Sequence, residues 1–168
     1  RQFKGGIFGE NDIIKRIYDY TASDAVETES ALAQVASEII DLDWLYVAPG
    51  IIDTHVHFRE PGNTEKGTIA SESAAAALGG VTSYMDMPNN NPPITTLQYL
   101  ANNFEIADRD SVVNYSFYLG ASNSNLKEIE AADPRHICAL KVFFGSSTGD
   151  MLVDDSHALS LIFNKSPL

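Results

Sequence analysis

Cysteine is almost absent from this sequence of 168 residues: Cys138 is the only one, so no disulfide can form within the chain. Such cysteine usage is typical of a reducing compartment, and we expect a cytoplasmic protein. Long apolar runs are also missing, and no stretch could span a bilayer as a helix. Basic side chains number only 11 against 23 acidic ones, which leaves a formal net charge of −12. This charge argues against nucleic acid and anionic membrane surfaces as partners.

The overall composition is that of a folded globular chain. Hydrophobic residues make up 44% and charged residues 20% of the sequence, and the length is enough for one ordinary core. The sequence begins at Arg1 without a methionine and ends shortly after a helical pattern. We therefore expect this chain to be part of a longer protein.

Residues 1–47 have the pattern of a small β domain. Short strands are predicted over 3–8, 13–20 and 38–47, with glycine-containing turns between the first two. The acidic, alanine-rich segment 24–37 is compatible with a loop or a weak helix. None of these residues suggests chemistry, so we interpret the segment as a partial N-terminal β domain.

Residues 48–168 alternate between strand and helix patterns. This alternation predicts parallel strands joined by right-handed crossovers. A closed (β/α)8 barrel of the TIM type needs eight such units, so four units make the first half of a barrel or a small open α/β sheet. The predicted strands are 50–57, 81–87, 112–119 and 137–144, and the predicted helices are 66–78, 95–108 with Thr95 as N-cap, 126–132 capped by Asn125, and one that follows Asp155 and Ser156.

The first of these strands carries a His-x-His pair. Side chains repeat every two residues on a strand, so Asp53, His55 and His57 are expected on one face. Two neutral imidazoles at the carboxyl end of a strand can bind one divalent cation, and zinc accepts such nitrogen ligands. The alternative is a pair of packing or surface histidines. The apolar strand around them and Arg59 after them favour a metal site.

Lys141 is the unusual residue of the fourth strand, because all its neighbours there are apolar. Burial of an ammonium is costly, and a neutral amine can add carbon dioxide to give a carbamate whose two oxygens can bridge two metals. Alternatively, the stem is buried and the charged head reaches solvent. The glycine- and serine-rich loop 145–149 that follows lacks the phosphate-binding P-loop pattern and is interpreted as an ordinary connection.

Several motifs, in order along the chain, resemble the dihydroorotases of the amidohydrolase superfamily. The resemblance runs from about residue 48 to 155 and is most specific over 50–92. The motifs are His55-Val56-His57-Phe58-Arg59-Glu60-Pro61-Gly62, Thr64-Glu65-Lys66, Ala70-Ser71-Glu72-Ser73, Gly79-Gly80-Val81-Thr82 and Asp86-Met87-Pro88-Asn89.

The resemblance implies a role for five residues. In that family the histidine pair binds one zinc of a centre with one or two metals, which implies His55 and His57 as ligands. A lysine at the end of the fourth barrel strand is carbamylated and bridges the zincs in many members, which implies Lys141. The arginine after the histidines and the asparagine after Met-Pro hold the substrate carboxylate, which implies Arg59 and Asn89.

The activity implied by the resemblance is zinc-dependent interconversion of dihydroorotate and N-carbamoyl-aspartate in pyrimidine biosynthesis. The expected partners are this small-molecule substrate and a second copy of the chain in a homodimer. The family's remaining histidine ligands and its general-base aspartate lie beyond Leu168, so no catalytic base is assigned. His136 and His157 match no ligand position and are interpreted as structural.

Two alternatives to this activity stay open. One is a sibling cyclic amidase that acts on allantoin or a hydantoin, whose rings lack the carboxylate that Arg59 would bind. The other is an inactive homologue that serves as a scaffold, which the intact His55, His57 and Lys141 argue against.

Overall fold

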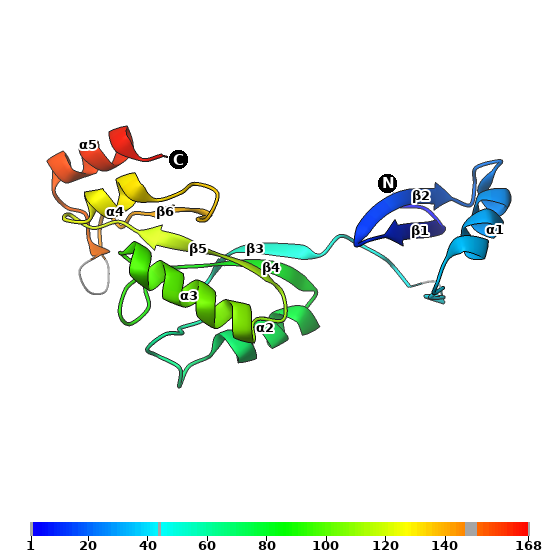
Figure 1. Ribbon diagram of the computed structural model, residues 1–168, viewed down its shortest axis with the longest axis horizontal. Coiled ribbons are helices and arrows are strands. Elements are labelled where there is room, and N and C mark those ends of the chain that lie inside the picture. The colour runs from blue at the N-terminus through cyan, green and yellow to red at the C-terminus, as the bar shows by residue number, and fades with distance from the viewer. Residues whose placement is uncertain (1, 44, 147–150, 168) are drawn as a thin grey trace. The chain divides into compact units, whose positions relative to one another are not determined.

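The computed structural model describes residues 2–43, 45–146 and 151–167. The chain divides into two compact units, Arg1–Ala48 and Pro49–Leu168 (Figure 1). Each unit has its own sheet, and the two are described separately below.

The first unit is a β-hairpin followed by a helix. Strands β1 (Gly5–Glu10) and β2 (Ile13–Asp19) are antiparallel and precede helix α1 (Ala25–Val35). Asn11 and Asp12 form the turn with φ angles of 51° and 61°. A tight two-residue hairpin turn requires this left-handed backbone, and asparagine and aspartate tolerate it better than most residues.

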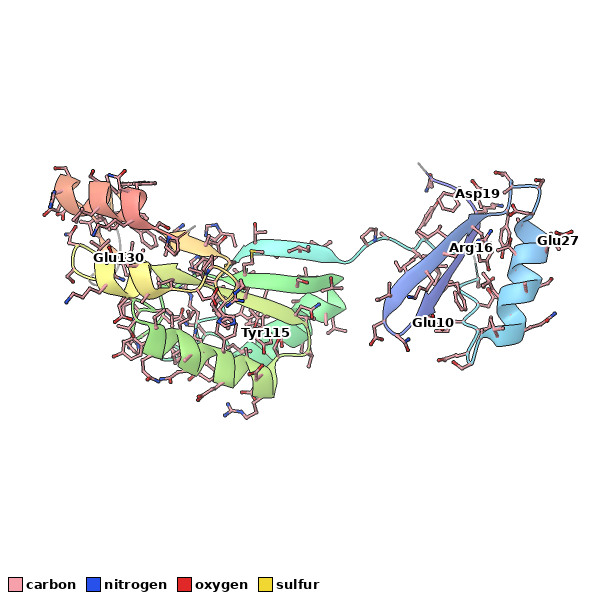
Figure 2. The ribbon with its side chains drawn as sticks, turned by 45° about the horizontal axis from the view of Figure 1, so that its top comes forward. Glu10, Arg16, Asp19, Glu27, Tyr115 and Glu130 are labelled. Atoms are coloured by element: carbon pink, nitrogen blue, oxygen red, sulfur yellow. The ribbon has the colours of Figure 1, made fainter. Side chains whose placement is uncertain are left out.

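Polar side chains tie the hairpin to α1. Arg16 of β2, labelled in Figure 2, donates hydrogen bonds of 3.4 Å to both Asp24 Oδ2 and Thr28 Oγ1. Tyr20 donates to Glu29 Oε1 at 2.8 Å. These contacts explain why the segment that the sequence left open between loop and weak helix is helical.

The predicted strand over 38–47 was wrong. Residues 38–43 and 45–47, the described part of this segment, form no strand. Its hydrophobic pattern was compatible with a strand, but a strand also needs a hydrogen-bonded neighbour, and β1 and β2 pair with each other.

The second unit is a parallel sheet with its helices. Four strands lie in the order β3-β4-β5-β6, each hydrogen-bonded in parallel to the next, so the predicted alternation of strands and helices is present (Figure 1). The elements are β3 (Ile51–Val56), α2 (Ile69–Leu78), β4 (Val81–Asp86), α3 (Leu97–Asp110), β5 (Asn114–Gly120), α4 (Leu126–Ala131), β6 (Ala139–Lys141) and α5 (Ser156–Lys165).

The core lies between the sheet and the helices. Tyr84 of β4 and Phe117 and Leu119 of β5 are buried against residues from α2, α3, α4 and α5. Burial of such side chains contributes about 1.5–3 kcal/mol each. The helical residues of this cluster are Ile69, Leu100, Ala107, Ile129 and Ile162. None of the helices in the described parts of the chain is long and apolar enough to cross a membrane.

Two helices begin later than predicted, for the same reason. A capping side chain accepts the backbone N–H of the second or third residue after it. Thr68 does so for α2, where its Oγ1 accepts from Ser71 N at 3.1 Å while Ser71 Oγ accepts from Thr68 N at 3.0 Å. Thr96, not Thr95, caps α3, because Thr96 Oγ1 accepts from Tyr99 N at 3.2 Å.

Asn125 precedes α4 but makes no capping bond with its side chain. Its Nδ2 instead donates to the backbone oxygens of Thr95 and Gly120, both at 2.8 Å, and its Oδ1 accepts from Ser122 N at 2.8 Å. Asn125 therefore joins the segment before α3 to the segment that follows β5.

Strand β6 is shorter than the predicted 137–144. Beyond Lys141, Phe143 makes only an isolated bridge to Leu152. The apolar run extends further than the backbone pairing because hydrophobicity reports burial, whereas the length of a strand depends on its neighbour, which here ends at Gly120.

Candidate active site

The carboxyl ends of the parallel strands carry the polar residues of interest. His55 lies in β3 and His57 follows it directly, Asn89 comes three residues after β4, and Lys141 is the last residue of β6. Carboxyl ends of parallel strands meet at one edge of a sheet, which is where active sites of α/β folds are built. The fold thus brings residues from three strands to the same edge.

His57 is the centre of this group. Its pKa is lowered below the ordinary histidine value, first by burial and then by the positive charge of Arg59, with smaller effects in the same direction from His55 and Lys141. The amide of Asn89 lies beside the ring and acts in the opposite direction. All four of the other predicted site residues therefore lie close enough to influence one imidazole.

The imidazoles of His55 and His57 lie close to each other. The ring centroids of His55 and His57 are 5.4 Å apart, with an angle of 54° between the rings. A lowered pKa favours the neutral imidazole at His57, whose free nitrogen can bind a metal. Within the described residues no group of three or more histidine, cysteine, aspartate or glutamate side chains could hold a metal. The pair fits a borderline cation such as zinc as part of a coordination sphere.

Arg59 is held by an unusual backbone turn. Its φ of 71° lies in the left-handed region, which non-glycine residues rarely adopt. Two hydrogen bonds fix the turn on either side: Phe58 N donates to Asp86 Oδ1 at 3.1 Å, and Asn63 N donates to Arg59 O at 3.0 Å. The guanidinium is therefore positioned relative to His57 by the backbone as well as by its own side chain.

The loop after β3 is also tied to the loop after β4. Asn90 Nδ2 donates to Glu60 O at 2.6 Å, and Asn91 N donates to Pro61 O at 3.2 Å. Gly62 has a φ of 101°, and a Cβ there would lie only 1.9 Å from Asn91 O. Any other residue at position 62 would push the two loops apart, so this motif glycine maintains their close approach.

Asp86 is a residue of this region whose role the sequence did not reveal. It is 1% exposed, and its Oδ2 has no hydrogen-bond partner in the described parts of the chain. Burial raises its pKa to about 7, although hydrogen bonds from Phe58 and Met87 and the charge of Arg59 oppose this shift. A lone carboxylate in an apolar strand was a visible signal, but its partner Phe58 lies 28 residues away in the chain.

Lys141 is half-buried, and its Nζ lies 5.0 Å from the centroid of the Phe143 ring. The end of the lysine side chain therefore lies over the face of an aromatic ring. The main chain of Lys141 pairs with Gly120 of β5, and its carbonyl accepts from Ala121 N at 2.9 Å. Residues 147–149 of the glycine- and serine-rich loop that follows lie outside the described residues.

The remaining histidines do not join the group. His136 is exposed, with its Nδ1 4.0 Å from Asp133 Oδ2. His157 is exposed in the first turn of α5, where its backbone N–H donates to Asp155 Oδ1 at 2.7 Å. Neither imidazole is among the groups that act on the pKa of His57.

Comparison with known proteins places this fold and site in a family. Residues 46–149 match the amidohydrolase family. The chain resembles the L-hydantoinase (dihydropyrimidinase) structure from Arthrobacter aurescens with a TM-score of 0.77 and 26% identity, covering 95% of this chain and 34% of that one. The four-stranded sheet is thus the first half of a (β/α)8 barrel, as the sequence predicted, and the chain belongs to the amidohydrolase family.

Similar relatives fall into two groups by name. An allantoinase of Desulfitobacterium hafniense (strain Y51) is 40% identical over 127 residues, which are 74% of this chain and 28% of that protein. A dihydroorotase of Methanothermobacter thermautotrophicus is 39% identical over 126 residues, which are 74% of this chain and 29% of that protein. A dihydroorotase of Lactococcus lactis is 49% identical over 76 residues, which are 45% of this chain and 18% of that protein. This chain therefore spans less than a third of the length of these relatives.

The raised pKa of Asp86 predicts a pH dependence of stability. The carboxyl titrates at about 7 in the folded protein and near its ordinary value of 3.8 when unfolded. Its contribution to stability is complete below about pH 4 and is lost as the pH rises from about 4 to 7, because over this range the unfolded state ionises while the folded state keeps its proton. Relative to Asp86→Asn, the wild-type free energy of unfolding should fall by on the order of 2–4 kcal/mol between pH 4 and 8 in urea titrations with chelator present.

Asp110, a carboxyl whose pKa is lowered rather than raised, provides the control for this experiment. The hydrogen bond from Arg109 lowers the pKa of Asp110, so this carboxyl is ionised in both the folded and the unfolded state above its ordinary value, and the difference between wild type and Asp110→Asn should stay constant from pH 4 to 8. A difference between wild type and Asp86→Asn that stays constant from pH 4 to 8 would contradict the prediction.

Proposed function

We propose that the protein carrying this chain is a zinc-dependent cyclic amidohydrolase that interconverts dihydroorotate and N-carbamoyl-aspartate. The observation that carries this proposal is the position of Arg59 beside His57, with its backbone held in a left-handed turn by Asp86. A guanidinium binds a carboxylate through two parallel hydrogen bonds, and dihydroorotate carries a carboxylate on its ring.

Each residue of the group has a proposed task. His55 and His57 would hold zinc through neutral imidazole nitrogens, and Lys141, once its neutral amine had added carbon dioxide, would supply two carbamate oxygens as further metal ligands. Arg59 and Asn89 bind the substrate carboxylate and thereby orient the ring amide toward the histidine pair. When bound, zinc lowers the pKa of a water ligand from 15.7 to about 7 and polarises a carbonyl oxygen.

The net charge of the chain supports a site with its own cations. A formal charge of −12 disfavours the approach of an anionic substrate. Arg59 supplies a positive charge at the strand ends, close enough to lower the pKa of His57. Local attraction over a few Å outweighs the more distant surface charges, which salt screens.

An allantoinase-like or hydantoinase-like activity is the second candidate. It is supported by the 40% identical relative named allantoinase and by the similarity to a hydantoinase structure. Both substrates contain a cyclic amide, so the same metal chemistry applies to them. Neither ring carries the carboxylate of dihydroorotate, however, and Arg59 would then have no anionic ligand.

Replacement of the paired histidines tests the metal site. His55→Ala and His57→Ala should each lower the zinc content of the purified full-length protein by at least one equivalent and abolish turnover, because each removes a side chain that would coordinate zinc directly. Zinc can be measured by mass spectrometry of the acid-digested protein. His157→Ala is the matched control, since its imidazole is exposed on α5. Unchanged zinc in His57→Ala would contradict the assignment.

Replacement of Arg59 tests the substrate. Arg59→Lys keeps the charge but loses the planar pair of donors, so KM for dihydroorotate should rise roughly tenfold or more while zinc content stays constant. Arg135→Lys is the control, because Arg135 is exposed and pairs with Asp133 at the surface. If the wild-type enzyme turns over allantoin but not dihydroorotate, the second candidate is supported instead.

Two substitutions of Lys141 separate a carbamate from a solvent-directed ammonium. If the carbamate bridges two metals, both Lys141→Ala and Lys141→Met should lose the second zinc, since two close cations repel without an anion between them. A short carboxylic acid should restore part of the activity of Lys141→Ala. Intact-mass measurement under gentle conditions should show the added carbon dioxide on Lys141. A fully metallated and active Lys141→Met enzyme would leave the carbamate without support.

A further inference from the structure

The strand that carries the histidine pair is irregular at its centre. Asp53 of β3 pairs with Tyr84, and Val56 pairs with Asp86. Three residue steps along β3 therefore lie opposite two steps along β4 at Thr54 and His55, which compensates for an opposite shift between Ile51 and Ile52. We call this irregularity at Thr54 and His55 the β3 bulge, since a local shift of register of this kind interrupts the ladder and bends the strand. The simple alternation that would place Asp53 on the face of the histidines is interrupted here.

Side chains make hydrogen bonds to two backbone groups at the bulge, the N–H of His55 and the carbonyl of Thr54. The N–H of His55 donates to Asp53 Oδ1 at 3.1 Å. The carbonyl of Thr54 is bound by the hydroxyl of Tyr118 at 2.9 Å. Tyr118 belongs to β5, two strands away, so its side chain reaches past β4 to contact β3.

Tyr118 lies on the same face of the sheet as Lys141. It pairs with Ala139 of β6, which is two residues before Lys141, and residues two apart share a face. Burial raises the pKa of Tyr118 above the ordinary tyrosine value, with a further effect from Cys138, so the phenol keeps the proton that it donates. The ring therefore lies beside the candidate metal group rather than in the layer of helices.

The bulge has a consequence for the imidazoles. Residues i and i+2 of a regular strand are about 6.6 Å apart along the strand. The ring centroids of His55 and His57 are 5.4 Å apart, with an angle of 54° between the ring planes. A bulge that is bound at the Thr54 carbonyl and the His55 N–H keeps the backbone that carries these rings in one conformation.

We propose that Tyr118 is a positioning residue for a divalent cation: through the Thr54 carbonyl it holds the β3 bulge that brings the His55 and His57 imidazoles together. The inference rests on the proposed function, in which these two histidines bind zinc. Residues that orient a metal ligand without touching the metal typically contribute tenfold to a hundredfold to affinity. A tyrosine that served only to hold two strands together would contribute to stability and leave zinc affinity unchanged.

The same strand offers a matched control. Tyr115 of β5, labelled in Figure 2, donates its hydroxyl to Asp108 of α3 and takes no part in the site. Tyr118→Phe and Tyr115→Phe each remove one hydroxyl from a half-buried tyrosine of β5. Any general loss of stability should therefore be similar in the two variants.

The first experiment measures zinc affinity of the full-length variants by competition with a chelator, alongside Tm. Tyr118→Phe should weaken zinc binding about tenfold or more, whereas Tyr115→Phe should stay within twofold of wild type. Equal affinities in the two variants would overturn the inference. If His57→Ala loses zinc affinity and Tyr118→Phe does not, this inference alone is overturned. If both variants keep wild-type zinc affinity, the proposed metal site is overturned as well.

The second experiment reports on the bulge without any metal. Hydrogen–deuterium exchange of the metal-free protein, followed by mass spectrometry, measures protection of the backbone amides around His55. Exchange there should be faster in Tyr118→Phe than in Tyr115→Phe, because Thr54 has lost its partner. Unchanged exchange would show that Tyr118 does not hold the bulge, and faster exchange with normal zinc affinity would show that the bulge does not position the ligands.

Discussion

The hydrogen bond from Phe58 N to the buried carboxyl of Asp86 is the constraint on which the candidate site depends. It joins the end of β4 to the residue between His57 and Arg59, so the histidine pair and the arginine keep a constant relation to the second strand. A buried carboxyl without a donor would be costly, and this backbone donor offsets part of that cost. The turn at Arg59, with its left-handed backbone, is stable only because contacts of this kind surround it.

Further contacts extend this constraint into the helix layer. Glu60 Oε2 accepts from Ile69 N at 2.7 Å, so the residue after Arg59 binds the first turn of α2. Asn90 holds the carbonyl of the same glutamate. The first turn of α2 is thereby connected to the loops at the strand ends. A motif that looks continuous in sequence is in fact a set of contacts among β3, β4 and α2.

The charges that act at the strand ends are opposite in sign to the net charge of the chain. The chain carries a formal charge of −12, yet the charges that act on His57 are those of Arg59, His55 and Lys141. Cationic neighbours disfavour a protonated imidazole and therefore favour the form that binds metal. The positive charge of Arg59 would suit an anionic ligand as well, so it is compatible with a neutral His57.

The sequence alone determined the class of fold and the candidate residues. Alternating strand and helix patterns predicted the parallel half-barrel, because hydrophobic periodicity reflects which faces are buried. Residue type and spacing indicated His55, His57 and Lys141, and the resemblance to a known family implied Arg59 and Asn89; the other four all act on the pKa of His57. Short motifs of this kind are visible in sequence because they depend on residue type and order along the chain.

Only the tertiary structure decided what holds those residues in place. The β3 bulge depends on pairing with β4 and on Tyr118 of β5, and the turn before Arg59 depends on Asp86 of β4, all far away in the chain. The predicted strand over 38–47 failed for the same reason: its pattern was compatible with a strand, but no strand of the first unit pairs with it. Strand register and buried polar partnerships are set by neighbours distant in sequence, and periodicity along a single segment contains no information about them.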